Sequence, residues 1–483
     1  MPGIRILIIL TIALGIRVAF WALIPVEMVA SDESTYYHAG LRLLTEGVQD
    51  VFFPPLTSWI IALTQLFSEP PSIKAARFFW VVLDTGNVLL LYLLTLGLTA
   101  STSGNRIEDQ SSRHHAPWRD DNEKAAILAA LFYTFYIPAL KYSQFATSEV
   151  PALFLLLASL NLIIYTRNNG LFSPVSIQPE SFKITCAYGS YFFVGILFGL
   201  VTLARGNLAL VGLSIACLLW FENRSLGKKF AGILFWCICS GLLLPIGSYM
   251  LGNYLGTGRL IFSQNVSYNL YIGNADVYQE DLNLFWPFAS PEQCQERQRM
   301  LQGSQRGITL NATEMRKAAV QNILNSPVLF LRRALGRLAR IFGPKTAPLA
   351  LLGGERKTGI FSLGPLFLLG LSALQYAFIL FLGIAGIFLL LGDHSLVGKL
   401  FSVTILSSLP LCLIAISKPR YSFPFEPVLI IAAVWFMIKV RQNLHRVWSH
   451  YKIPLLIIYG FLIWSWLAWL IFSFSSRLKV YGG

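Results

Sequence analysis

The chain has 483 residues, of which 55% are hydrophobic and only 13% are charged. Soluble domains carry about 25% charged residues, so this composition, with a mean hydropathy of +0.59, excludes a soluble globular protein. The formal net charge of +14 comes from basic residues at helix ends and in loops, which favours anionic lipid over nucleic acid as their partner.

Apolar runs long enough to cross a bilayer recur along the whole chain. A helix needs about 20 apolar residues to span the hydrocarbon core, and continuous runs favour helices over barrel strands, which alternate in polarity. The predicted fold is an all-α polytopic membrane bundle of about 11 transmembrane helices, because lipid-exposed backbone must satisfy its own hydrogen bonds. The spans are predicted near residues 4–25, 78–99, 125–141, 150–166, 188–204, 207–221, 230–250, 363–391, 398–416, 427–440 and 454–474.

Basic residues in short loops set the predicted orientation. The segments "ENRSLGKK" (222–229) and "KVRQNLHRVWSHYK" (439–452) fall on the same side, so that side is predicted to be cytoplasmic. The first apolar run is read as an uncleaved span rather than a signal peptide, since no clear small-residue cleavage site precedes Ser31. The N-terminus is then inside. The two runs that flank "LARGN" are short, which is consistent with a pair of half-penetrating helices.

The spans and loops divide the chain into three parts. Residues 1–250 form an N-terminal transmembrane module, with a first outer loop at 26–77. Residues 251–362 form an outer loop domain, and 363–483 form a C-terminal transmembrane module.

Two segments of the outer parts are predicted as helices that lie at the membrane surface. "PPLTSWIIALTQLF" (54–67) is too short to span comfortably and begins with a proline pair suited to a helix N-terminus. The second is 327–342, whose leucines and arginines fall on opposite faces, a pattern that favours membrane anchoring over catalysis. The residues concerned are Leu331, Leu335, Leu338 and Phe342 on one face and Arg333, Arg337 and Arg340 on the other.

Ionisable residues gather at the predicted outer ends of the spans. Such groups are costly at a membrane and are candidates for function. Those at mid-depth are few, chiefly Asp84 and Asn87, and we expect both to bond to neighbouring helices rather than to line a transport path. The distribution favours a reaction centre at one membrane face. Its candidate residues are Asp32, Glu33, Glu149, Arg205, Lys418 and Arg420.

Transfer of a sugar from a lipid phosphate uses these residue types. The acceptor hydroxyl loses its proton as it attacks the anomeric carbon, which needs one carboxylate as general base. The departing phosphate is a good leaving group and needs cations rather than a proton donor, a role suited to guanidinium groups.

Each candidate also has a structural interpretation. Asp32 or Ser31 is suited to capping a helix that runs to Leu44. Glu149 resembles a first-turn helix acid, and the arginines resemble anchors at a lipid surface.

Several segments, in chain order, resemble a known family. "SDESTYYHAGLRLL" carries an Asp-Glu pair followed by Tyr and then Ala-Gly, and "FFPPLTSWIIALTQLF" carries a Pro-Pro-Leu segment. "ATSEVPALFLLLASLNLIIY" has an acid two residues before Pro, and "GILFGLVTLARGNLALV" is a Gly-rich pair of runs around Arg. Together they resemble the class C glycosyltransferases, polytopic enzymes that use polyprenyl-phosphate sugars and include protein O-mannosyltransferases and the lipid A aminoarabinose transferase.

The resemblance implies a class C bundle and a role for each candidate. Phe53 departs from the family pattern, because it stands where His precedes the two prolines. Some relatives bind a divalent cation near the acidic pair; this sequence leaves metal dependence open, and no cofactor is certain. The implied roles are Asp32 as general base, Glu33 as its neighbour, Glu149 as the second acidic site, Arg205 and Arg420 at the donor phosphate, Lys418 as an outer cation, and Tyr36 and Tyr37 in the sugar pocket.

The function expected from these features is inverting transfer of a monosaccharide. The donor would be a polyprenyl-phosphate sugar, and the acceptor a hydroxyl of a glycolipid, a polysaccharide or a protein. The site is expected on the non-cytoplasmic face, in a bacterial inner membrane. A lipid or glycan transporter and a non-catalytic membrane subunit are the alternatives, and neither would need a catalytic base.

Overall fold

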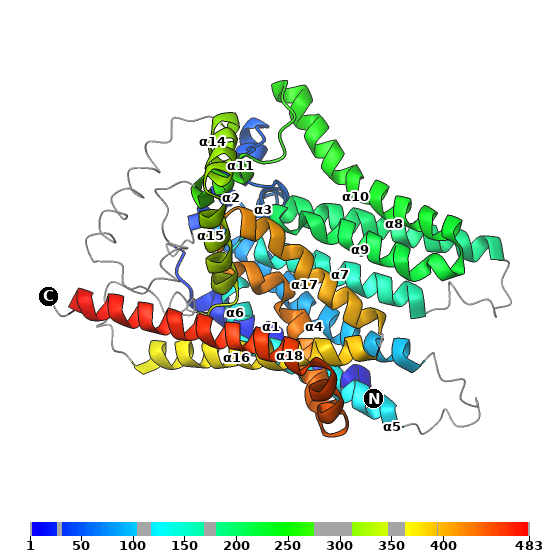
Figure 1. Cartoon of the computed structure of the whole chain (residues 1–483). Helices are drawn as coiled ribbons and strands as arrows, with labels where there is room; N and C mark the ends of the chain where they lie inside the picture. Colours follow the sequence, from blue (N-terminus) through cyan, green and yellow to red (C-terminus); the bar gives the residue numbers. More distant parts are fainter. Residues whose placement is uncertain are drawn as a thin grey trace.

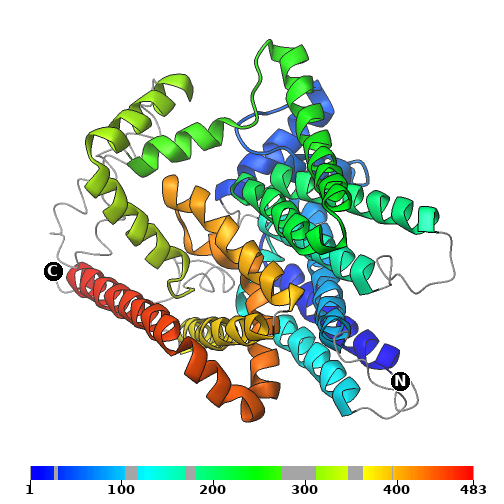
Figure 2. The same cartoon turned by 45° about the vertical axis from the view of Figure 1, so that its right-hand side comes forward.

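The computed structural model describes residues 2–26, 31–103, 117–168, 180–274, 312–345, 363–393 and 395–481. Every regular element in these residues is helical. The long helices form one bundle, while α2 (Ser31–Glu46), α3 (Leu56–Gln65), α11 (Gln264–Asn274), α14 (Ala312–Asn325) and α15 (Pro327–Ile341) gather at one end (Figures 1 and 2). We call this the α2/α3 end.

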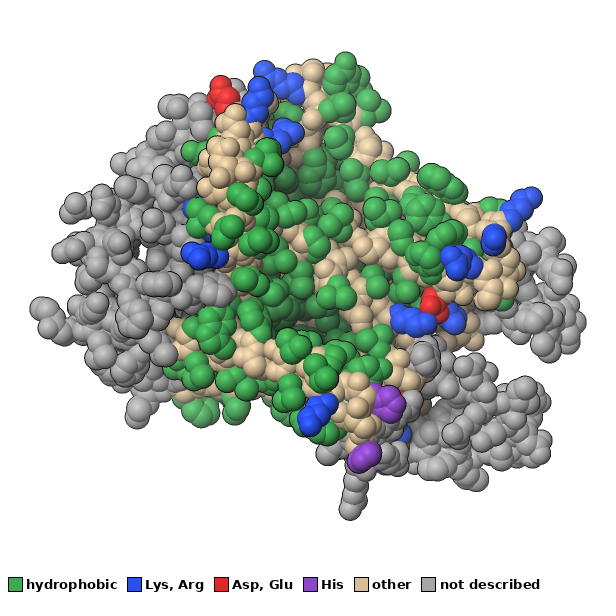
Figure 3. Space-filling model, viewed as in Figure 1, with side chains coloured by type: hydrophobic (Ala, Val, Ile, Leu, Met, Phe, Trp, Pro, Cys, Tyr) green, Lys and Arg blue, Asp and Glu red, His purple; other side chains and the backbone are tan. Residues whose placement is uncertain are grey.

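Ten helices of the described residues are long and apolar enough to cross a membrane. Hydrophobic side chains cover most of the face seen in Figure 3, and Lys and Arg lie toward its edges, as expected for a lipid-facing surface. The chain is therefore a multi-pass membrane protein. The spans lie in α1 (Pro2–Leu23), α4 (Ile73–Ser103), α7 (Glu149–Asn168), α8 (Glu180–Ala204), α9 (Ala209–Asn223), α10 (Lys228–Thr257), α16 (Leu363–Gly392), α17 (Leu396–Ile414), η5 (Pro419–Phe425) continued into α18 (Glu426–Tyr481), and the later part of α18.

One further helix, α5 (Pro117–Thr134), completes the bundle. It starts beside the N-terminus of α1 (Figure 1) and packs against α4 and α18. Its first turns carry charged residues, including Asp121 and Glu123, so its apolarity is lower than that of the ten. Adding α5 to the ten apolar spans accounts for the predicted number of about eleven crossings.

Two boundary predictions need correction. The helices around "LARGN" are not half-penetrating, because the spans Cys186–Ala204 and Gly206–Leu226 have 19 and 21 residues, enough to cross. The predicted span 125–141 ends early, at Thr134. Pro138 lies in the first turn of α6 (Ile137–Tyr142), and its missing N–H does not allow the preceding helix to continue.

Small residues permit the closest helix contacts. Gly195 of α8 faces Gly241 of α10, and a Cβ on either glycine would overlap the other helix's backbone. Gly386 of α16 lies in the same way against Ala432 of α18. Membrane helices associate through such close backbone packing because lipid offers no hydrophobic drive to bring them together.

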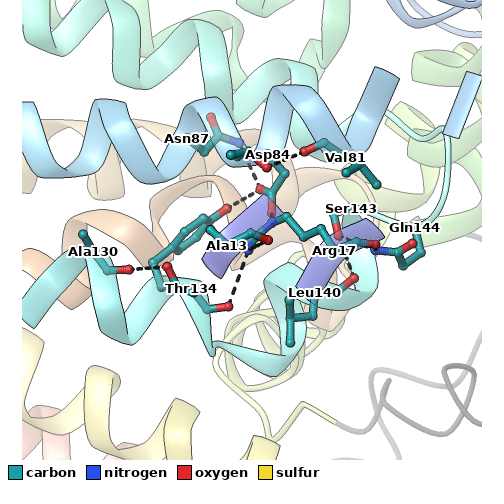
Figure 4. Close-up of polar contacts among 12 residues, drawn as sticks. Ala13, Arg17, Val81, Asp84, Asn87, Ala130, Thr134, Leu140, Ser143 and Gln144 are labelled. Atoms are coloured by element: carbon teal, nitrogen blue, oxygen red, sulfur yellow. Dashed lines mark hydrogen bonds and ion pairs between the residues drawn. The ribbon is translucent and has the colours of Figure 1, made fainter. Parts of the chain in front are cut away.

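A buried polar network ties α1, α4 and α5 together inside the bundle (Figure 4). Arg17 Nε lies 2.7 Å from Asp84 Oδ2, and both side chains are fully buried. Tyr133 donates to Asp84 Oδ1 at 2.6 Å, and Asn87 donates to the same oxygen at 3.1 Å. The prediction that Asp84 bonds to neighbouring helices is confirmed, and Arg17 is the buried partner that the sequence prediction missed. Asn87 donates to Asp84 of its own helix, so the same prediction for Asn87 is not confirmed.

The helix α15 matches the predicted segment, but its arginine face points the other way. Arg333 and Arg337 are buried, whereas Leu331 and Leu335 are exposed. Arg337 donates to the carbonyl of Gly273 at the end of α11 and to the carbonyls of Leu413 and Ile414 at the end of α17. These two arginines therefore satisfy helix C-terminal carbonyls, and the prediction that they serve as membrane anchors is wrong.

Candidate active site

The carboxylate pair lies in the first turn of α2 as the structure describes it, from Ser31. Acids are favoured in a first turn because the helix dipole is positive there. Successive helical residues point about 100° apart, so Asp32 and Glu33 face different partners. Asp32 pairs with Arg420, and Glu33 pairs with Arg77.

Glu33 forms a buried ion pair that connects parts of the fold. Its two oxygens accept from Arg77 Nε and Nη2, each at 2.9 Å, and neither side chain is more than 2% exposed. Glu33 Oε1 also accepts from the Ala146 backbone N–H at 2.8 Å. Glu33 thus joins α2 to α4 and to the segment before Glu149, and its surroundings suit positioning rather than direct chemistry.

The second acid, Glu149, is the first residue of α7. Its Oε1 lies 3.0 Å from Arg205 Nη1, and the Glu149 side chain is 2% exposed. Arg205 stands between α8 and the short turn η2 (Gly206–Leu208), with an extended backbone that interrupts the helix. Its guanidinium lies 5.1 Å from the centre of the Tyr421 ring, and its Nε donates to Asn207 Oδ1 at 3.1 Å.

Arg420 connects the two acids. Its Nη2 pairs with Asp32 Oδ2, and its Nε lies 3.6 Å from Glu149 Oε1. It projects from η5, so four elements that are far apart in sequence meet at one point. We call Asp32, Glu149, Arg205 and Arg420 the acid–guanidinium cluster.

Three polar atoms of this cluster are buried without a hydrogen-bond partner among the described residues. They are Glu149 Oε2, Arg205 Nη1 and Arg420 Nε. Buried polar atoms in native proteins are almost always bonded to protein or to water. Arg205 Nη1 and Arg420 Nε still face Glu149 Oε1 as ion pairs, so Glu149 Oε2 is the open acceptor, beside two guanidinium groups suited to an anionic group.

Three lysines flank the cluster, and two of them, Lys141 and Lys345, were not predicted from the sequence. Lys141, in α6, is half-buried; burial lowers its pKa to about 8, with Glu149 opposing and Arg420 adding to the shift. Lys345 is buried and lies 2.8 Å from Glu426 Oε1, and burial lowers its pKa. Lys418, which was predicted, lies at the exposed rim near Arg420. Both of these lysines lie in apolar surroundings, and a lysine in such surroundings is a signal that could have identified them as candidates.

The two predicted pocket tyrosines differ in position. Tyr36 is buried, its ring lies 4.7 Å from that of Phe53, and its hydroxyl bonds to Ser148. Burial raises the pKa of Tyr36, and the nearby Glu149 raises it further, so it stays a neutral donor beside the cluster. Tyr37 is half-buried and packs against His38 at 5.9 Å, with no contact to the cluster shown.

These side chains do not form a suitable ligand set for a divalent metal. No group of three or more His, Cys, Asp or Glu suited to an ion occurs within the part of the chain that the structure describes. His38 is exposed and packs on Tyr37. Asp32 and Glu149 face guanidinium groups, which repel a cation, so the residues present do not fit a metal.

Comparisons with known proteins give structural matches alone: no family model and no curated protein matches the chain. An archaeal oligosaccharyltransferase, AglB from Archaeoglobus fulgidus in complex with an inhibitory peptide and a dolichol-phosphate, superposes with a TM-score of 0.50 and 16% identity, over 98% of this chain and 56% of that one. The A. fulgidus oligosaccharyltransferase tethered to an acceptor peptide gives a TM-score of 0.50 and 14% identity, over 95% and 54%.

These matches concern the fold. The chain spans about half the length of the oligosaccharyltransferase chains, along the whole of its own helical bundle. With its helical architecture and its membrane-spanning helices, the chain has the fold of the class C glycosyltransferases.

Proposed function

We propose that the protein is an inverting glycosyltransferase that moves a monosaccharide from a polyprenyl-phosphate donor to an acceptor hydroxyl. The observation that carries this proposal is the acid–guanidinium cluster, in which two carboxylates meet two guanidinium groups and Glu149 Oε2 has no hydrogen-bond partner among the described residues. One carboxylate for a proton and two guanidinium groups for a phosphate are the groups that such a transfer requires.

In the proposed reaction Asp32 accepts the proton of the acceptor hydroxyl. The hydroxyl oxygen forms a bond to the anomeric carbon while the bond from that carbon to the phosphate oxygen breaks. The phosphate leaves with the bonding electrons, and its charge is balanced by Arg205, Arg420 and protonated Lys141. A single displacement inverts the anomeric centre and needs no acid–base pair of the glycosidase kind.

Glu149 and Glu33 would act by positioning. Glu149 holds Arg205 at 3.0 Å and keeps one oxygen open for the acceptor. Glu33 binds the Ala146 backbone N–H, three residues before Glu149, and so holds the start of α7 close to the start of α2. This contact would hold Asp32 and Glu149 in a fixed position relative to each other.

The carrier chain would approach from the lipid between the α8–α9 pair and α16. α17 packs against both α9 and α16, and apolar side chains are exposed along this path, among them Leu213, Leu406 and Phe367. The face in Figure 3 is recessed at its centre and lined there by hydrophobic side chains. The dolichol-phosphate in the AglB complex supports a lipid-phosphate partner for this fold.

The proposed site faces the non-cytoplasmic side of a bacterial plasma membrane, with α11, α14 and α15 as the described helices of the outer domain. The basic loops at 222–229 and 439–452 support this orientation. A transport function receives less support, because the mid-depth residues Arg17 and Asp84 are fully buried and bond to each other, and Asp84 also accepts from Tyr133.

Reconstitution of the purified protein tests the proposal. The protein in liposomes would be given polyprenyl-phosphate monosaccharides of several sugars together with membrane glycolipids as acceptors, and mass spectrometry would follow free polyprenyl phosphate and glycosylated product. Sugar-dependent release of both supports transfer. Movement of the donor across the bilayer without cleavage of its sugar would instead support a transporter.

A further inference from the structure

We propose that the Arg420 guanidinium is the resident cation of the site, bridging Asp32 and Glu149 where a divalent metal would otherwise sit, so that transfer needs no divalent metal. The statement about transfer rests on the proposed function; the statement about the cation site does not. A bridging cation offsets the repulsion between two carboxylates that separate helices hold close together.

The geometry of Arg420 carries the proposal. Its Nη2 and Nε lie on one edge of the planar guanidinium, and that edge ordinarily binds the two oxygens of a single carboxylate. Here Nη2 pairs with Asp32 Oδ2, while Nε lies 3.6 Å from Glu149 Oε1. One edge of the Arg420 guanidinium is thus shared between Asp32 of α2 and Glu149 of α7. A bridging metal ion would be shared between two carboxylates in the same way.

The charges around the bridge disfavour a second cation. Arg205 also pairs with Glu149, at 3.0 Å, so two carboxylates already face two guanidinium groups. Lys141 and Lys418 add further positive charge nearby. Divalent cations bound through oxygen need several ligands with negative charge, and the site offers more cations than acids.

Buried contacts hold Arg420 in this place. Lys345 donates to the carbonyl of Pro419 and to Ser422, on either side of Arg420 in the chain. Lys345 is itself paired with Glu426 Oε1 at 2.8 Å, and Ser422 donates to the same oxygen at 2.7 Å. The segment that carries Arg420 is therefore anchored at both ends, and the guanidinium is preorganised.

Electron paramagnetic resonance of added Mn²⁺ tests the proposal on the purified full chain. The wild type is expected to leave Mn²⁺ free. Arg420→Ala, which vacates the bridge but keeps both acids, is expected to bind Mn²⁺ with an affinity on the order of 100-fold above that of the wild type, because a repelling charge has gone. Arg420→Lys keeps the charge and is expected to bind none.

Two variants localise the signal. Asp32→Asn combined with Arg420→Ala is expected to abolish the new Mn²⁺ site. Arg259→Ala, at an exposed arginine after α10, is the matched control and is expected to behave as wild type.

The opposite results would overturn the inference. A wild-type Mn²⁺ site that disappears in Asp32→Asn or Glu149→Gln would show that metal, not Arg420, bridges the acids. A monodisperse Arg420→Ala protein whose Mn²⁺ affinity equals that of the wild type would show that Arg420 does not occupy the bridging position. The wild-type measurement decides even if Arg420→Ala does not fold, and none of these results depends on transferase activity.

Discussion

Asparagine at position 32 would remove the proposed base while keeping the size of the side chain. Asp32→Asn is expected to lower kcat for sugar transfer by about 100- to 10,000-fold, the usual contribution of a positioned general base. KM for the donor is expected to change only a few-fold, because Arg205, Arg420 and Lys141 still face the phosphate.

The structure separates this effect from loss of the Asp32–Arg420 ion pair. The two side chains are 20% and 25% exposed, and partly exposed pairs contribute about 1 kcal/mol or less. If Asp32 only held Arg420, its replacement would lower activity by about fivefold, which corresponds to that energy. The two roles thus differ by more than an order of magnitude in the expected rate.

The assay is the initial rate of polyprenyl phosphate release by purified protein in liposomes, at saturating donor. Asp50→Asn is the matched control, because Asp50 lies in the same loop region, is 19% exposed and pairs with Arg42. It is expected to retain wild-type kcat. A folded Asp32→Asn protein whose kcat stays within about fivefold of wild type would refute the base assignment.

Three further variants test the surroundings of the cluster. Glu33→Gln leaves Arg77 buried without its counter-charge and is expected to destabilise the protein by about 3–5 kcal/mol, seen as a lower Tm in detergent. Lys141→Arg is expected to change the pH profile of kcat/KM: in the wild type the value falls as pH rises through about 8, because the ammonium loses its proton and its attraction for phosphate, whereas arginine stays charged. Lys345→Met leaves Glu426 unpaired and releases the Arg420 segment, so both Tm and kcat are expected to fall.

Specific outcomes contradict each of these expectations. An unchanged Tm in Glu33→Gln would mean that the buried pair with Arg77 is not formed. A falling limb near pH 8 that persists in Lys141→Arg would assign that titration to another group. A Lys345→Met protein with lower Tm but wild-type kcat would show that the lysine stabilises the fold without positioning Arg420.

The element boundaries that the sequence predicted well depend on local signals. The helix after the first span carries Ser31, Asp32 and Glu33 in its first described turn, residue types that favour a helix start, and α3 begins directly after Pro55. The α15 segment was also recognised, from its helical spacing of leucine and arginine. The direction in which α15 presents its arginines was predicted wrongly, since spacing defines two faces but does not say which one the protein covers.

The candidate site was predictable in its residue types and not in its pairings. Glu33 and Asp32 are neighbours in sequence, yet one is locked to Arg77 and the other meets Arg420. Lys345 precedes a segment outside the described residues, and nothing in its sequence neighbourhood points to Glu426.

The sequence by itself determined that this chain crosses a membrane many times and carries the candidate site residues at one end of its helices. Span length, apolarity and loop charge are properties of short stretches, so they can be determined from the sequence without the tertiary structure. Only the tertiary structure decided that Asp32, Glu149, Arg205 and Arg420 meet at one point. Their pairing depends on how four helix ends pack and on which way each side chain leaves its helix, and these are set by contacts between residues far apart in the chain.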